Sequence, residues 1–218
     1  MRQRGVAPTR DRDIATVLAR LGYSGAARER ARAALEAAGL TNPRKSRISE
    51  AKLDRVRFAL AERFALVCDD PACRAELASE RPRAELVPVR QRTHCDSCAG
   101  SDNARASRGF VATCRASGVR RLVVVGGSPG LREELASLLG PRLELRLVDG
   151  TIARPLNRAR ADIAWADLIV VCGRSELTHQ VSRQYTESAR RNVLLAPRRG
   201  VAAMLGEATV FLERHRAT

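Results

Sequence analysis

Apolar residues recur at helical spacing in the first third of the chain. Ile14, Val17, Leu18 and Leu21 follow the i, i+3, i+4, i+7 pattern of one buried helix face. Gly22 suits the end of this helix, because glycine readily adopts the left-handed backbone that follows a C-cap. The pattern therefore predicts a short amphipathic helix over residues 14–21.

Two further helices are expected before residue 64. Ser24 is a suitable N-cap for an alanine-rich helix that runs to about residue 38, with Gly39 after its end. Pro43 disfavours helix in the residue before it, and Ser49 is placed to cap the third helix. Three short helices with tight connections resemble a helix-turn-helix module, which we expect over residues 1–64.

The period changes after residue 118. Short apolar runs rich in β-branched residues alternate with turns and helical stretches; they cover residues 121–125, 143–148, 166–172 and 192–196. Strand, turn and helix repeated in this order predict a parallel sheet with helices packed on it, a Rossmann-like or flavodoxin-like layer. We therefore expect an α/β protein with a Rossmann-like domain of about four strands over residues 119–218.

Four cysteines between these regions have the spacing of metal ligands. They form C-x4-C, then 21 residues, then C-x2-C, at Cys68, Cys73, Cys95 and Cys98. Each pair lies near a short β-type run, as in a zinc ribbon or paired zinc knuckles. Four thiolates at such spacing form a closed tetrahedral shell that supplies folding energy rather than catalysis. Residues 65–118 are thus expected to be a zinc-ribbon-like segment with a linker helix, holding a structural Zn²⁺.

Other roles for the cysteines stay open at this point. Cys95 and Cys98 form a C-x-x-C of the redox type, although no thioredoxin-like βαβ pattern follows them. His94 is an alternative ligand or a neighbour of the site. Cys114 and Cys172 lie among apolar residues and are interpreted as small core side chains.

The charge points to a polyanionic partner. The formal net charge is +15 over 218 residues, and residues 1–64 alone carry 15 basic and 7 acidic side chains. All basic residues except Lys45 and Lys52 are arginine, a choice that GC-rich coding also explains; coding bias does not explain the excess of base over acid. Nucleic acid is the usual partner of such a charge.

A basic loop is the strongest candidate for this contact. Arg44, Lys45 and Arg47 lie between the second and third predicted helices, beside hydroxyl side chains and a helix N-terminus. Cations, hydroxyls and unpaired helix amides bind phosphate oxygens and position a backbone rather than read bases. The alternative is an ordinary solvated loop.

Parallel sheets bind ligands beyond the carboxyl ends of their strands. The candidate ligand or phosphate-binding residues at these ends are Gly126, Gly127, Ser128, Asp149, Arg174, Ser175, Thr178, His179 and Arg198. The GGSPG turn is neither a dinucleotide fingerprint nor a Walker motif, and its glycines serve equally well for the turn alone. His179 is a candidate acid or base with Asp149 and Arg198 as partners, yet no complete catalytic set is present.

The last hundred residues resemble the bacterial family known as domain of unknown function 2325. The likeness rests on VVVGG after the first strand, Asp149-Gly150 after the second, and ADLIVVC followed by Thr178-His179, where the family has Ser-His. It covers less than half of the chain. The resemblance implies a small Rossmann-like domain in proteins without an established activity.

These features lead to three hypotheses. The first is a non-enzymatic protein that binds duplex or structured nucleic acid through arginine–phosphate contacts, alone or inside a larger complex, because 3% aromatic residues leave little for base stacking. The second is a nucleotide or small-ligand sensor, and the third an enzyme acting on phosphoesters through His179. No apolar run reaches the roughly 20 residues of a membrane span, and the first residues lack a secretory pattern, so a cytoplasmic protein is expected.

Overall fold

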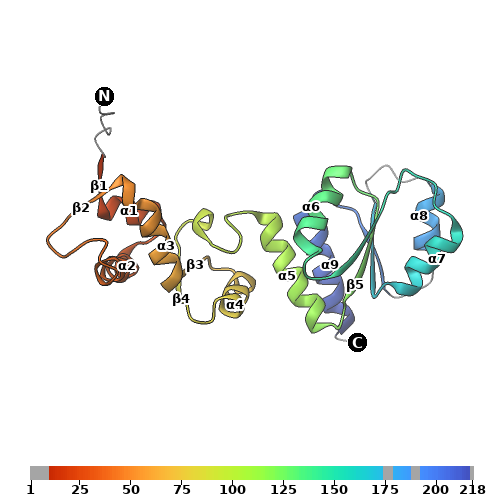
Figure 1. Cartoon of the computed structure of the whole chain (residues 1–218). Coiled ribbons are helices and arrows are strands. Elements are labelled where there is room, and N and C mark those ends of the chain that lie inside the picture. The colour runs from red at the N-terminus through yellow and green to blue at the C-terminus, as the bar shows by residue number, and fades with distance from the viewer. Residues whose placement is uncertain (1–9, 174–178, 188–191, 217–218) are drawn as a thin grey trace, which may run out of the picture. The chain divides into compact units, whose positions relative to one another are not determined.

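The computed structural model describes residues 10–173, 179–187 and 192–216. Contacts within the chain group it into two units, residues 1–101 and 102–218 (Figure 1). This grouping differs from the three segments expected from the sequence. Leu66 and Val87 of the cysteine segment share the core of the N-terminal helices, whereas Phe110 and Cys114 belong to the core of the sheet domain.

The first half of unit 1 contains the predicted helices and two short strands. The elements are β1 (Asp11–Asp13), α1 (Ile14–Arg20), α2 (Gly25–Ala37), β2 (Arg47–Ser49), the 3-10 turn η1 (Glu50–Lys52) and α3 (Leu53–Arg63). Gly22 and Gly39 end α1 and α2 with φ of +95° and +67°. The N–H of each glycine and of the residue after it bonds back to the last turn, so the predicted helix ends are confirmed.

The strands β1 and β2 were not foreseen. They pair antiparallel, with Arg12 opposite Ile48, and Ile48 is buried in the core between the helices. Arg47, expected in a loop, therefore lies in a strand. The helices surround one core, but the likeness to a helix-turn-helix module stays a prediction.

The second half of unit 1 is a β-α-β element rather than a ribbon. It consists of β3 (Phe64–Val67), α4 (Pro71–Glu80), β4 (Glu85–Pro88) and the 3-10 turn η2 (Arg92–His94). β3 and β4 run parallel, with Ala65 opposite Leu86, because α4 carries the chain back between them. The zinc-ribbon layout expected from the two apolar runs is therefore wrong, because a helix connects the two strands and the strands run parallel.

Unit 2 is a parallel sheet between two helical layers. Its elements are α5 (Asp102–Ala116), β5 (Arg121–Val125), α6 (Pro129–Leu139), β6 (Glu144–Val148), α7 (Leu156–Trp165), β7 (Leu168–Cys172), α8 (His179–Thr186), β8 (Val193–Ala196) and α9 (Val201–Arg216). The strand order is β6-β5-β7-β8, all parallel, which confirms the predicted parallel sheet of about four strands. α5, α6 and α9 cover one face, and α7 and α8 the other (Figure 1).

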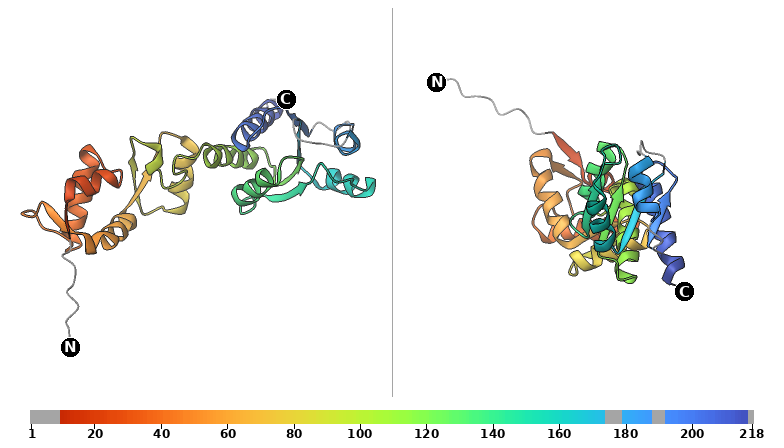
Figure 2. Two further views of the ribbon diagram at one scale, coloured as in Figure 1. Left: turned by 90° about the horizontal axis from the view of Figure 1, so that it is seen from above. Right: turned by 90° about the vertical axis from the view of Figure 1, so that its right-hand side faces the viewer.

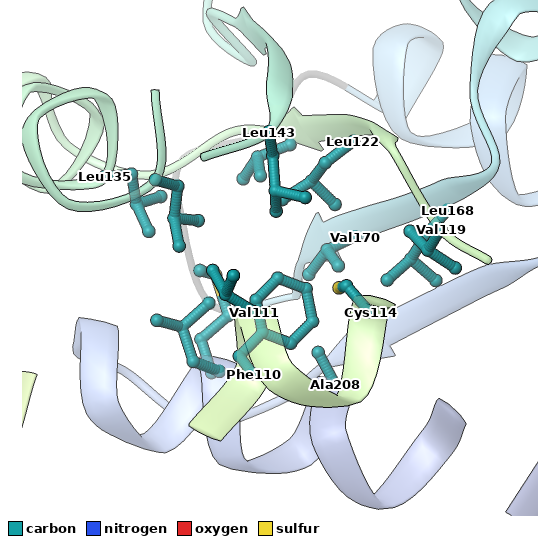
Figure 3. Packing of buried hydrophobic residues seen from close by; sticks show 14 of the residues in the cluster. Phe110, Val111, Cys114, Val119, Leu122, Leu135, Leu143, Leu168, Val170 and Ala208 are labelled. Carbon is teal, nitrogen blue, oxygen red and sulfur yellow. The ribbon is translucent and has the colours of Figure 1, made fainter. Parts of the chain in front are cut away.

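The main core of unit 2 lies between the sheet and the α5–α9 pair, which lie side by side (Figure 2). Figure 3 shows Phe110 and Cys114 of α5 packed toward Leu122, Val170 and Ala208. Burial raises the pKa of the Cys114 thiol to about 12. Cys114 is thus a small core side chain, as expected.

In the described part of the chain the longest helix, α9, has 16 residues. None of the described helices is long and apolar enough to cross a membrane.

Candidate metal centre and ligand cleft

The four spaced cysteines meet in unit 1. The sulfur atoms of Cys68, Cys73, Cys95 and Cys98 all lie within 4.8 Å of one another, and all four residues are buried. The Sγ atoms of Cys68 and Cys98 are 3.9 Å apart. Four sulfurs about 2.3 Å from a central ion in a tetrahedron are about 3.8 Å apart. The arrangement can therefore hold a metal ion.

The β3–α4 connection positions the first pair. Cys68 follows β3 directly, and Cys73 lies in the first turn of α4. Asp70 is the N-cap of α4, and its Oδ1 accepts hydrogen bonds from the N–H groups of Ala72 and Cys73 at 2.9 and 3.2 Å. This cap fixes the backbone that carries Cys73 beside Cys68.

A tight turn after η2 positions the second pair. The N–H of Ala99 donates to the carbonyl of Cys95 at 2.8 Å, and Ala99 adopts a φ of +47°. Asp96 holds this turn against β3, because its N–H donates to the Leu66 carbonyl and its carboxylate accepts from the Leu66 N–H, both at 2.8 Å. These hydrogen bonds with β3 therefore hold the Cys95–Cys98 turn close to Cys68, which follows the same strand.

The surroundings shift the pKa values of the cysteine thiols in different directions. Burial raises the pKa of Cys68 and Cys73 above the ordinary thiol value. Burial acts in the same direction on Cys95, but hydrogen bonds from the backbone of Cys98, Cys68 and Ser97 to its sulfur hold its pKa below that value. Backbone donors around one sulfur of a C-x-x-C turn stabilise the thiolate that a metal requires.

His94 belongs to the scaffold rather than to the sulfur cluster. Its Nε2 donates to the Arg20 carbonyl at the end of α1, at 3.1 Å. A Cβ at Gly22 would lie 2.9 Å from the His94 Cβ, so the two elements are in close contact. The role of His94 is to join the cysteine turn to the helices.

The basic loop of unit 1 is held by a side chain that the sequence did not single out. Arg32 of α2 donates to the carbonyls of Pro43 and Lys45 at 3.2 and 2.9 Å, and its Nε pairs with Glu36. The side chains of Arg44 and Lys45 are exposed and make no ion pair within the described residues.

Arg47 differs from these two cations. Its guanidinium donates to the Asp11 carbonyl at 2.9 Å, and it lines a groove of about 480 Å³ together with the acidic Asp11, Asp13 and Glu50. The predicted trio is therefore split: Arg44 and Lys45 face solvent at the loop, whereas Arg47 joins the two strands.

Unit 2 contains a cleft of about 840 Å³ at the carboxyl ends of its strands. Its lining comes from the turns after β5, β6 and β8, from the last residue of β7, and from α5, α6 and α9: Asn103, Gly127, Ser128, Pro129, Leu131, Arg132, Glu134, Asp149, Thr151, Cys172, Arg198, Arg199, Gly200, Val201 and Met204. Four predicted ligand residues, Gly127, Ser128, Asp149 and Arg198, are thus brought together.

An ion pair shapes one side of the cleft. Arg132 donates to the Gly127 carbonyl and to the Asp149 Oδ2, the latter at 2.7 Å. The Asp149 Oδ1 accepts from the hydroxyl and the N–H of Thr151 at 2.7 and 2.9 Å. Hydrogen bonds from Thr151, with the charge of Arg132, hold the pKa of Asp149 below its ordinary value, so the carboxylate is ionised at neutral pH.

The other predicted ligand residues have different outcomes. Gly126 does not line the cleft; its N–H donates to the Val148 carbonyl at 2.9 Å. Arg174, Ser175 and Thr178 lie outside the described residues, and of His179 only the backbone, at the start of α8, is described.

Two lining residues carry sequence signals that were missed. Arg199 follows Arg198 in the same turn, and Arg132 lies in the first helical turn after GGSPG. Cys172, predicted as core, both packs on the core and borders the cleft. Burial raises the pKa of Cys172 to about 11, so this thiol is not a ready nucleophile at neutral pH.

Comparison with protein-family models, with curated proteins and with solved structures finds no match to this chain. The likeness of the last hundred residues to domain of unknown function 2325 therefore stays a prediction, and function has to be argued from the sites themselves.

Proposed function

We propose that this protein binds nucleic acid without catalysis, through contacts between unit 1 and the phosphate backbone, with a zinc ion in the four-cysteine site as a structural element. The observation that carries the proposal is the α2–β2 loop, which presents two cations from a backbone that Arg32 holds in place. These two cations are the side chains of Arg44 and Lys45, and both are exposed.

A loop held in this way favours binding. Ordering a flexible loop on binding costs conformational entropy, and a backbone already fixed by Arg32 avoids part of this cost. The surplus of basic over acidic side chains in residues 1–64 adds long-range attraction to phosphates. Contacts of this kind depend on the shape and charge of the partner rather than on its base sequence.

The sulfur set supports zinc as the metal. Soft thiolates favour Zn²⁺ over hard cations, and four of them leave no open position for a substrate. A bound ion would link the residue after β3, the first turn of α4 and the turn after η2, and so stiffen the part of unit 1 that packs on α1 and α3.

Fluorescence anisotropy with labelled duplex DNA, duplex RNA and single strands, each at several salt concentrations, tests the nucleic-acid proposal. Wild-type protein is expected to bind one class at sub-micromolar concentration near physiological salt. Arg44→Ala with Lys45→Ala is expected to weaken this binding for all sequences and to lower the slope of log K against log salt by about 1.8, the effect of two phosphate contacts.

The control removes the same charge elsewhere. Arg63 and Arg83 are exposed cations of unit 1 that lie outside the loop, and Arg63→Ala with Arg83→Ala gives an equal net charge. Equal losses in the two double variants would show a generic charge effect and remove the loop from the proposal. Weak binding of all probes by the wild type, lost with modest salt, would contradict the function itself.

Metal analysis of the purified protein tests the zinc assignment. We expect about one Zn²⁺ per chain, lost in Cys98→Ser and retained in Cys172→Ser, whose sulfur is outside the cluster. Iron in place of zinc, or equal metal content in the two variants, would contradict it.

A further inference from the structure

We propose that the cleft of unit 2 binds a nucleoside 5′-monophosphate. The proposal rests on the cleft alone and does not depend on nucleic-acid binding by unit 1. Three features of the lining carry it: exposed cations for a phosphate, an unused carboxylate acceptor position for a sugar hydroxyl, and an apolar wall for a base.

The cleft has the size and place of a ligand site. Its volume of about 840 Å³ lies in the range of small-molecule sites, roughly 300–1,000 Å³. The strand order changes direction at β5, with β6 on one side and β7 on the other. Open α/β sheets bind ligands at this switch point, beyond the carboxyl ends of the strands, where Gly127 and Cys172 border the cleft.

The turn after β8 supplies charge for a phosphate. The Arg198 side chain is 76% exposed, and its Nε lies 3.4 Å from Glu207. Arg199 is exposed and has no ion pair within the described residues. Adjacent guanidiniums form strong, charge-assisted hydrogen bonds to phosphate oxygens. Arg132, the third cation, is already committed to Asp149.

Asp149 has one acceptor position left. Its two oxygens offer about four lone-pair sites. Thr151 uses two of them on Oδ1, and Arg132 uses one on Oδ2. The carboxylate is ionised and its orientation is fixed by these bonds, so the remaining site on Oδ2 suits a sugar hydroxyl better than a second anion.

Part of the cleft lining is apolar. Leu131 of α6 and Val201 and Met204 of α9 line it, and Met204 and Val201 are almost fully buried. Such a surface favours a flat, weakly polar ring over a bare sugar phosphate. Base, sugar and phosphate together define a nucleotide rather than inorganic phosphate.

Isothermal titration of the full-length protein with AMP, GMP, CMP and UMP tests the proposal, with the matching nucleosides and inorganic phosphate as separate probes. At least one monophosphate is expected to bind at micromolar concentration, and its nucleoside and phosphate alone at least about tenfold more weakly. Arg198→Ala with Arg199→Ala is expected to weaken the monophosphate by at least about tenfold and to leave the nucleoside unchanged.

Arg115→Ala with Arg120→Ala is the matched control, because these exposed cations lie in the last turn of α5 and just before β5, at the amino end of this strand and not at the carboxyl end where the cleft lies. It should bind like the wild type, as should Arg44→Ala with Lys45→Ala, which separates this site from the loop of unit 1. The proposal is overturned if no monophosphate binds at about millimolar concentration, or if both arginine pairs in unit 2 reduce affinity equally.

Discussion

Single arginine side chains stabilise the backbone of the basic loop in unit 1 and of the cleft in unit 2. Arg32 bonds to two carbonyls of the basic loop, and Arg132 joins the turn after β5 to the carboxylate after β6. Arg81 does the same near the metal centre, where it donates to the carbonyls of Ala61 and Phe64. One guanidinium has five donors in a fixed plane, so a single side chain can satisfy several acceptors. Part of the arginine content therefore stabilises the local structure of the chain.

The ionised state of Asp149 gives a pH-dependent prediction. Its pKa is depressed in the folded protein, so its contribution to stability is present above the ordinary value of 3.8 and is lost as the pH falls below it. Asp149→Asn should lower the urea midpoint at neutral pH, since Arg132 loses its counter-charge. The difference from the wild type should shrink as the pH falls through 3.8. A constant difference over the pH series would show that the charge is unimportant.

At the scale of single residues, the four-cysteine site could be predicted from the sequence, whereas the contacts of the arginine side chains could not. The spacing of Cys68, Cys73, Cys95 and Cys98 carries the geometry of a tetrahedral site, whatever the backbone between them does. The partner of Arg132 is 17 residues away, and nothing local to either residue indicates the pair. Long-range polar contacts depend on how elements pack, which the sequence pattern does not specify.

Among the elements, the connection between α1 and α2 is tightly constrained at Gly22. Gly22 ends α1 in the left-handed region, and a side chain there would meet His94 of the cysteine turn. Gly25 also has a positive φ, but nothing lies within 4 Å of the place that its Cβ would take. The two glycines thus share a backbone constraint and differ in packing.

Gly22→Ala and Gly25→Ala separate these effects. Left-handed backbone costs an alanine about 1 kcal/mol at either position. Gly22→Ala should be destabilising by a further 1–3 kcal/mol or so, because a contact at 2.9 Å to the His94 Cβ forces α1 and the cysteine turn apart. Urea unfolding of both variants measures the difference. Equal midpoints would mean that the helices and the cysteine turn are not tightly joined.

Helices and strands with a clear pattern of apolar residues could be predicted from the sequence, whereas elements without such a pattern could not. Apolar runs such as residues 121–125 and the 3.6-residue period of α1 are properties of the sequence itself. β1 and β2 have three residues each, too few to show an alternation, and exist because their edges pair. The parallel direction of β3 and β4 depends on α4, a helix whose pattern was not interpreted between the two cysteine pairs.

On the scale of the whole molecule, the two units have separate cores. The N-terminal core draws only on residues before 102, and both cores of the sheet domain draw only on residues after it. The four-cysteine site lies entirely in unit 1, and the cleft entirely in unit 2. Each candidate site therefore depends on the stability of one unit.

Metal removal should shift the thermal transition of unit 1, measured by calorimetry, away from that of unit 2. A strong chelator is expected to lower the melting temperature of unit 1 by at least about 10 °C, because a structural ion contributes several kcal/mol to a unit of this size. The transition of unit 2 should stay within about 2 °C of its original position. Cys98→Ser should reproduce the chelator effect and so identify the transition. Equal shifts of both transitions would contradict the independence of the two cores.

The order of the four cysteines along the chain has a consequence for biosynthesis. Cys68 and Cys73 leave the ribosome first, and the set is complete only when Cys98 follows, three residues before unit 1 ends. Asp96 and His94, which tie the cysteine turn to β3 and α1, emerge in the same interval. The nascent helices therefore lack their contacts with the cysteine turn until almost the whole of unit 1 has left the ribosome.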